Sequence, residues 1–414
     1  MLKTLLVICL AGGMLQGGVV LAIDSSLWRP FPQHGVYAQG TIGPNHRTQE
    51  QLDDDVRAFY DHWKAAYLAR VPGNPTRYRV LSGPGRTVSE GQGYGMIIVA
   101  IMAGYDPNAQ GIFDGLWYYT HDHPSNIDPR LMAWEIPEDV GGEDSAFDGD
   151  ADIAYALILA DAQWGSEGEV NYRAEARARI SAILESTIGP QSHLPTLGDW
   201  VKPDGNPYNQ YTPRSSDFMP AHFRAFWHFT GDAVWEDVIM ASQRVISSLQ
   251  QAYSPEAGLL PDFIEQDSRT DHGYRPADPN FLEGRHDGDY YYNAGRAPWR
   301  IATDALLNND GVSMMQARRI ADWIAAATDR NPENIRAGYH LDGTPIKGSD
   351  YFTTFFVAPF GVAVMTQPGE QTFLDALYDA VYKTHEDYYE DSVTLLCLLV
   401  MTGNYWKPTV PQYN

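Results

Sequence analysis

The residues of this sequence that could do chemistry are acids set among glycines and aromatic residues. Glu90 lies in Ser89–Met96 (SEGQGYGM), where an acid and three glycines open a strongly apolar stretch. Asp148 lies in a similar acid-rich segment, Ser145–Asp150 (SAFDGD). Glu283 lies in a loop in which further acids precede three tyrosines. Carboxyl groups in different environments can serve as general acid and general base, so these segments are the candidates for a site in this sequence.

Each acid also has a structural explanation. Glu90 could stabilise a helix start through the helix dipole, Asp148 or Asp150 could cap a helix, and the loop of Glu283 could be solvated surface. Three glycines in a first helical turn cost stability, however, and they are expected where a ring or a partner helix approaches the backbone closely. Tyrosines beside the loop acids favour a sugar groove over an ordinary surface loop.

Other kinds of catalytic site are absent from the sequence. It has no HExxH, GxSxG or P-loop motif. His121 and His123 have no complementary ligand cluster and indicate a solvated helix end. Residues 148–152 imitate the start of a calcium loop, but Ile153 and Leu159 stand where that loop needs glycine and glutamate. We therefore expect neither a metal ion nor a cofactor.

Helices must position these acids, because helical periodicity recurs along the chain. Apolar spacing predicts helices over residues 49–70, 89–105, 108–121, 150–164, 169–188, 217–230, 233–253, 293–307, 312–328, 352–365, 372–383 and 392–402. Strand signals are sparse, and Tyr78–Leu81 is the strongest. This series predicts an all-α fold of helical hairpins, and the pattern alone does not distinguish a closed barrel from an open bundle. Three long loops, 122–149, 189–216 and 254–292, carry the acids and favour a ligand-covering role.

Composition bounds the class of protein. An apolar run, Leu5–Val20, follows a basic start, so we expect residues 1–22 to be a signal peptide cleaved after Ala22. Residues 23–414 are then expected to form one exported, soluble domain, since no linker separates a second module. The net charge of −24 disfavours nucleic acid and suits a neutral or cationic partner. Cys9 falls in the signal, so Cys397 has no disulfide partner and is expected in the core.

Several motifs together resemble glycoside hydrolase family 8. They are SEGQGYGM (89–96), AGYDPNA (103–109), IFDGL (112–116), LMAW (131–134), DADIAYALILADAQW (150–164) and PWRIA (298–302), in the family's order. The resemblance implies an (α/α)6 barrel of six inner and six outer helices, with long loops forming a substrate groove. It also implies an inverting endo-glycanase acting on cellulose, lichenan, xylan or chitosan.

The same resemblance implies roles for individual acids. Glu90 matches the family's general acid, and Asp148 matches the acid that holds the distorted sugar at the cleavage point. Much of the family has an aspartate as general base where this sequence has Asn293, whose amide cannot take a proton. The departure is similar to a subfamily of glucanases and chitosanases whose base is a glutamate in the upstream loop. The expected base is therefore Glu283, with two alternatives, Asp287 and Asp289.

Inversion requires one protonated and one ionised carboxyl group, roughly 6.5–9.5 Å apart. A helix N-terminus lowers the pKa of Glu90, whereas burial and the charge of Asp148 raise it, and we predict that the second effect wins.

Candidate sugar-binding residues lie near these acids. Tyr94, Trp134 and Trp200 are possible stacking platforms, and each could equally be a core side chain. Hydrogen bonds to sugar hydroxyls are expected from Asp217, Arg296 and Asn293. Asp217 could instead cap the helix that it starts.

The predicted function is a secreted, monomeric, inverting endo-glycosidase that cleaves internal β-1,4 bonds of β-glucan, chitosan or both. The displaced base disfavours an endo-xylanase, and the acidic charge suits chitosan. Asn293 invites one alternative, a catalytically silent carbohydrate-binding protein on the same scaffold. A structural repeat protein would need an internal period, which the sequence lacks.

Overall fold

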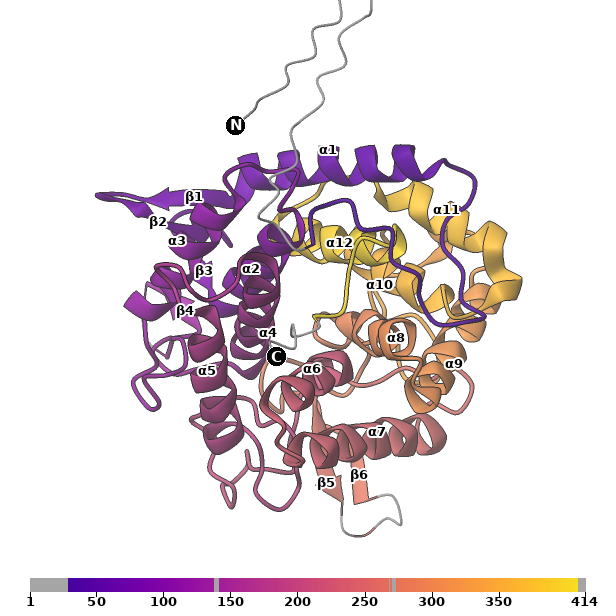
Figure 1. The fold of residues 1–414 in the computed structure, drawn as a ribbon. Helices are drawn as coiled ribbons and strands as arrows, with labels where there is room; N and C mark the ends of the chain where they lie inside the picture. Colours follow the sequence, from indigo (N-terminus) through magenta and orange to yellow (C-terminus); the bar gives the residue numbers. More distant parts are fainter. Residues whose placement is uncertain (1–28, 138–140, 268, 270–272, 409–414) are drawn as a thin grey trace, which may run out of the picture.

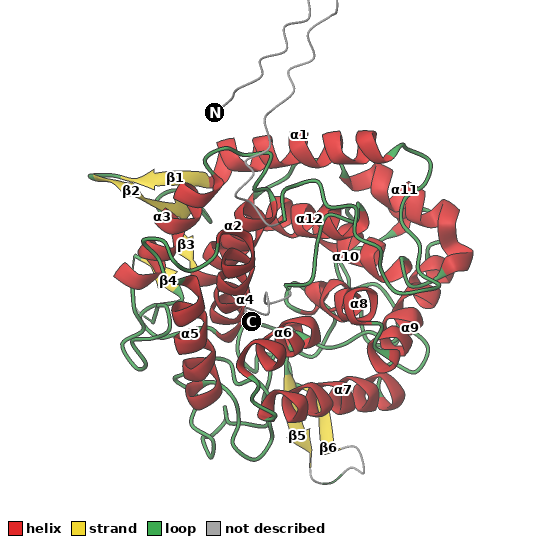
Figure 2. Ribbon diagram, in the orientation of Figure 1, coloured by secondary structure: helices red, strands yellow, loops and turns green. Residues whose placement is uncertain are grey.

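The computed structural model describes residues 29–137, 141–267, 269 and 273–408. The predicted signal peptide lies outside these residues. Within them the chain forms twelve α-helices arranged as two concentric rings, which Figures 1 and 2 show from one end of the barrel.

Six alternate helices form the inner ring. They are α2 (Ser89–Ile101), α4 (Phe147–Trp164), α6 (Pro220–Thr230), α8 (Ala297–Asn308), α10 (Thr354–Val364) and α12 (Tyr388–Met401). Each packs on the next along the chain, and α12 packs back on α2, so the ring is closed. The outer helices are α1 (Gln49–Tyr67), α3 (Ala109–Asp122), α5 (Tyr172–Ser186), α7 (Val234–Ala252), α9 (Gly311–Ala327) and α11 (Gln371–Val381). The predicted (α/α)6 barrel is confirmed, and closure decides against the open bundle.

The two rings differ because their helices bury different amounts of surface. In α4 every residue from Phe147 to Gln163 is buried, as expected for a helix that is apolar on all sides. In α1 one stripe is buried, with Leu52, Val56 and Phe59 at three- and four-residue steps. Cys397 is buried in α12. No helix within the described ranges combines the length and apolarity needed to cross a membrane.

Three small antiparallel sheets of two strands each lie outside the rings. They are β1 (Leu68–Val71) with β2 (Asn74–Val80), β3 (Thr87–Val88) with β4 (Glu135–Ile136), and β5 (Ile264–Asp267) with β6 (Gly273–Pro276). The predicted strand Tyr78–Leu81 overlaps β2, and the other strands were not predicted. The β3–β4 pair fixes the start of α2, because the Ser89 N–H continues it by donating to the Trp134 carbonyl at 2.9 Å.

Several helix starts differ from the predicted ones. Helix α4 begins at Phe147, before the expected Asp150, so Asp148 lies in its first turn and the N-cap is Ala146. The predicted capping by Asp148 or Asp150 is therefore wrong. Helix α12 begins at Tyr388 rather than at the predicted Ser392, so it has one more turn at its N-terminus.

Candidate active site

The site lies where the inner helices begin. Glu90 is in the first turn of α2, Asp148 is in the first turn of α4, and Arg296 ends a 3-10 turn, η2 (Ala294–Arg296), that leads into α8. Tyr388 opens α12 and donates to Glu90 Oε1 at 3.4 Å. Helix N-termini carry partial positive charge, so this end of the barrel favours an accumulation of carboxylates.

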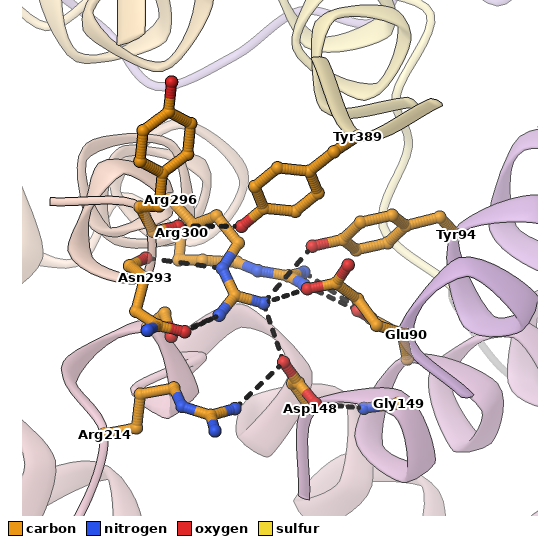
Figure 3. A network of polar contacts seen from close by, with 12 residues as sticks. Glu90, Tyr94, Asp148, Gly149, Arg214, Asn293, Arg296, Arg300 and Tyr389 are labelled. Atoms are coloured by element: carbon orange, nitrogen blue, oxygen red, sulfur yellow. Dashed lines mark hydrogen bonds and ion pairs between the residues drawn. The ribbon is translucent and has the colours of Figure 1, made fainter. Parts of the chain in front are cut away.

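The buried guanidinium of Arg296 is the centre of the polar network in Figure 3. Its Nη1 donates to Glu90 Oε2 at 2.5 Å and to Asp148 Oδ2 at 2.7 Å. Its Nη2 donates to Ser216 Oγ at 2.8 Å and to Asn293 Oδ1 at 3.1 Å. Arg296 is only 1% exposed, so it positions these groups rather than presenting a free face to sugar hydroxyls.

Asn293 connects this centre to Glu283. Its Nδ2 donates to Glu283 Oε2 at 2.8 Å, while its Oδ1 accepts from Arg296. The two carboxyl groups predicted as acid and base are thus joined through one guanidinium and one amide. Glu283 is half exposed, whereas Glu90 is 17% exposed, so water reaches Glu283 more freely.

The two alternative bases, Asp287 and Asp289, form hydrogen bonds with groups other than Asn293. Asp287 is buried and accepts the backbone N–H groups of Leu282, Glu283 and Gly284 at 2.7–3.0 Å. Asp289 pairs with the imidazoles of His286 and His340 at 2.7 and 2.8 Å. Asp287 therefore shapes the loop that carries Glu283, and neither aspartate contacts Asn293.

The environment gives the two inner acids opposite charge states. Burial raises the pKa of Glu90 to about 7; Arg296 opposes this shift and Asp148 reinforces it. For Asp148 burial acts in the same direction, but Arg296 and Arg214 outweigh it and hold the pKa below its usual range. The pKa of Glu90 is raised, which is the direction that the sequence predicts. A carboxyl with this pKa retains its proton in mildly acidic solution and can act as a general acid.

The glycines of the first turn of α2 allow two close approaches. A side chain at Gly91 would overlap the hydroxyl of Tyr388, the tyrosine that contacts Glu90. A side chain at Gly93 would come within 2.7 Å of Asp152 Cβ and 3.0 Å of the Gly149 carbonyl, both in α4. These are the ring and the partner helix that the sequence predicts at this segment.

Two predicted sugar contacts need correction. Tyr94 is fully buried, with its ring against Trp299 and its hydroxyl 3.5 Å from Arg296 Nη1, so it has no free face for stacking. Asp217 is also fully buried, and neither of its carboxylate oxygens has a hydrogen-bond partner among the described residues. It does not cap α6, whose N-cap is Met219.

The two tryptophans remain partly exposed. Trp134 packs on the main core, and its Nε1 donates to the Gly141 carbonyl at 2.6 Å. Trp200 packs edge to face on Tyr208 in a small second cluster that includes Leu282, the residue before Glu283. Trp134 lies next to strand β4 and Trp200 lies beside the loop of Glu283, and the structure does not bring either ring into contact with Glu90.

Sequence analysis missed three charged positions. Arg214 donates to Asp148 Oδ2 at 3.4 Å and to Glu283 Oε1 at 3.3 Å. Asp262 is buried, accepts from the Ala294 N–H at 2.6 Å and lies 3.5 Å from Asn293 Nδ2, so it fixes the backbone and amide of Asn293. Arg300 forms a buried two-bond pair with Asp152 at 2.6 and 2.9 Å. The one available signal for Arg214 was its position in a long loop, three residues before Asp217.

Comparisons with known proteins agree with this geometry. Residues 55–403 match the profile of Glycosyl hydrolases family 8. A β-glucanase of Niallia circulans is 43% identical over 98% of this chain and 97% of its own length, and an endoglucanase of Bacillus sp. (strain KSM-330) is 38% identical over 92% and 82%. The solved structure of a β-1,3-1,4-glucanase from Paenibacillus sp. X4 superposes with a TM-score of 0.88 at 43% identity, covering 92% of this chain and 99% of that one. The chain belongs to glycosyl hydrolase family 8 and is a glycoside hydrolase.

Proposed function

We propose that this glycoside hydrolase is an endo-β-glucanase that cleaves internal β-1,4 bonds with inversion, with Glu90 as general acid and Glu283 as general base. One observation carries the assignment: a chain of hydrogen bonds through Arg296 and Asn293 joins Glu90, a partly exposed carboxyl of raised pKa, to the half-exposed carboxylate of Glu283. An inverting hydrolase needs one acid of each kind, on opposite sides of the bond that breaks.

The chemistry follows from these environments. Glu90 gives its proton to the glycosidic oxygen as the bond from that oxygen to the anomeric carbon breaks. Glu283 takes a proton from a water molecule, whose oxygen attacks the anomeric carbon from the opposite face. Glu90 is left ionised and Glu283 protonated, and exchange with solvent restores both. Asp148 stays ionised beside the cleavage point and stabilises the positive charge that develops on the sugar ring.

The proposed substrate rests on the similar proteins. Those of 38–43% identity are named β-glucanase, endoglucanase and β-1,3-1,4-glucanase. Chitosan is the second candidate, because a net charge of −24 attracts a polycation. A xylose complex of Rex8A from Paenibacillus barcinonensis is only 20% identical, with a TM-score of 0.72, and supports the fold alone.

Side-by-side hydrolysis of lichenan, carboxymethyl-cellulose and chitosan tests the substrate class. Glu283→Gln should lower kcat about 10²- to 10⁴-fold, the usual contribution of a general base. Glu265→Gln is a matched control, since Glu265, on strand β5, pairs with Arg275 on strand β6. The product released first should be the α-anomer, which proton NMR distinguishes. Release of the β-anomer, or full activity of Glu283→Gln, would overturn the assignment.

We also propose that the protein is exported as a monomer after cleavage behind Ala22, with residues 23–414 as one catalytic domain. The support is the basic start, the apolar run and the small residues before Ile23. N-terminal sequencing of protein from the culture medium should begin at Ile23, and light scattering should give the mass of one chain. Intact Met1 in cell-bound protein would contradict export.

A further inference from the structure

A second cluster of ionisable side chains lies where α1 passes the start of α12. His62 projects from α1, His385 lies just before α12, and Asp391 is in the first turn of α12. His62 Nε2 is 3.5 Å from Asp391 Oδ2, and His385 Nδ1 is 3.6 Å from the same oxygen. One ligand atom from each residue lies within 4.8 Å of the other two.

These separations are long for direct hydrogen bonds. Elsewhere in the protein the imidazoles of His46, His222 and His340 approach an aspartate oxygen to 2.8–2.9 Å, within the usual range. Around a tetrahedral ion with bonds of about 2.0–2.1 Å, neighbouring ligand atoms stand about 3.3–3.4 Å apart. The spacing around Asp391 therefore fits the edges of a coordination shell better than it fits direct pairing.

The environment of Asp391 favours the binding of a cation. The residue is fully buried, and no Lys or Arg forms an ion pair with it among the described residues. A buried carboxylate without a cation is unfavourable. Its orientation is fixed by the Tyr67 hydroxyl, which donates to Oδ2 at 2.9 Å, and by the Glu386 N–H, which donates to Oδ1 at 2.8 Å. Such outer contacts are typical of metal-ligating carboxylates.

The two imidazoles are suited to bind as neutral ligands. Their rings stack with centroids 3.7 Å apart, so two positive charges at this distance would repel. Two neutral imidazoles and one carboxylate form a ligand set for zinc and similar ions rather than for calcium or magnesium.

We propose that His62, His385 and Asp391 bind one divalent transition-metal ion, with zinc as the preferred ion, and that this ion ties α1 to the start of α12. Two imidazoles that radiate from one ion need centroids about 5 Å apart, so the stacked rings must fan open. The side chains are 43% and 31% exposed and have room to do so, and water can complete the shell. His62 lies far from His385 and Asp391 in the sequence, which is why sequence analysis predicted no metal.

The ion would stabilise the start of α12 beside the active site. Asp387 caps α12, and the next residue, Tyr388, contacts Glu90. Glu386, which donates its N–H to Asp391, also accepts the Thr354 N–H at 2.6 Å at the start of α10. Bound zinc should therefore raise thermal stability, because it joins α1 to this segment.

The experiment uses the full chain, stripped with a chelator and titrated with zinc by calorimetry and by thermal denaturation. We expect one ion per chain and a higher Tm with zinc. Cobalt should give the visible absorption of a low-coordinate site. His62→Gln and His385→Gln should each weaken zinc binding at least about tenfold, while His228→Gln, on α6, should not change it.

Glu283→Gln separates this site from the active site, because its zinc affinity should equal that of the unmodified chain. Both histidines are partly exposed, so their variants should fold, as circular dichroism will check. Absence of stoichiometric binding, or equal affinity in His62→Gln, His385→Gln and the unmodified chain, would overturn the proposal and leave the hydrolase assignment intact.

Discussion

Replacing Asp148 with asparagine should move the alkaline limb of the pH–activity profile to lower pH. Glu90 Oε2 and Asp148 Oδ2 share one nitrogen of Arg296, at 2.5 and 2.7 Å, so the two oxygens lie no more than about 5 Å apart. At an effective dielectric constant of about 20, two unit charges at 5 Å repel by about 3 kcal/mol, equivalent to about two pKa units. Removing this repulsion lowers the pKa of Glu90.

A second effect has the same sign. Without the charge of Asp148, Arg296 pairs more strongly with Glu90 and further favours its ionised form. In the proposed mechanism Glu90 must be protonated to act, so activity should be lost as pH rises through its pKa, which is raised to about 7 in the unmodified protein. Since Glu90 is partly exposed and screened by solvent, we expect the midpoint of the alkaline limb to move to lower pH by about one to two units.

The assay is the pH dependence of kcat/KM on lichenan, measured by reducing-sugar release at enzyme concentrations high enough for a weakened variant. Asp122→Asn is the control, because it removes the same charge from a surface pair with Arg77. If activity is too low, infrared difference spectra of carboxyl-labelled protein can follow the protonation of Glu90 directly. An alkaline limb whose midpoint pH is unchanged or higher in Asp148→Asn would refute the electrostatic argument.

Three further outcomes follow from the described contacts. Asn293→Ala removes the hydrogen bond to Glu283 and should lower kcat about 10- to 100-fold with little change in KM, since a bond to a charged group contributes about 1.5–3 kcal/mol; an unchanged kcat would refute this. Gly91→Ala forces a methyl group onto Tyr388 and should cost about 1–3 kcal/mol in chemical denaturation, whereas Gly111→Ala, which meets open space in α3, should stabilise. Burial raises the pKa of Asp217 to about 7, against the pull of Arg214, so the stability from its neutral form is present at acid pH and is lost as pH rises through that value. The loss begins near the usual pKa of 3.8, so Asp217→Asn should raise Tm more at about pH 8 than at about pH 5, and an equal gain at both would count against the assignment.

The sequence predicted those parts of the site whose residues lie close together along the chain. Glu90 and its glycines lie in one helical turn, so the motif alone indicated an acid that a ring and a helix approach closely. The start of α4 was misplaced because its first turn is acidic and carries little apolar periodicity. The exposure of Tyr94 could not be read from its type, because core packing and sugar stacking favour the same aromatic side chain.

The contacts that were missed depend on barrel closure. Tyr388 reaches Glu90 only because α12 packs back on α2. Arg214 reaches Asp148 and Glu283 because two long loops meet. Such pairs have no spacing rule in one sequence, since their separation along the chain is set by loop lengths that can vary without changing the barrel.

Arg214 adds to the effect of Arg296 in setting the charge states of the two inner acids. One nitrogen of Arg296 donates to both Glu90 and Asp148 at nearly equal distances, so these two hydrogen bonds alone do not explain why the two carboxyls differ in pKa. Asp148 also receives Arg214 and the Gly149 N–H, whereas the other oxygen of Glu90 receives only the Tyr388 hydroxyl at 3.4 Å. Of two neighbouring carboxyls, the one with fewer donors keeps the proton. Because Arg214 contacts Asp148 and Glu283 but not Glu90, the carboxyl left as the acid is the one that this cation does not touch.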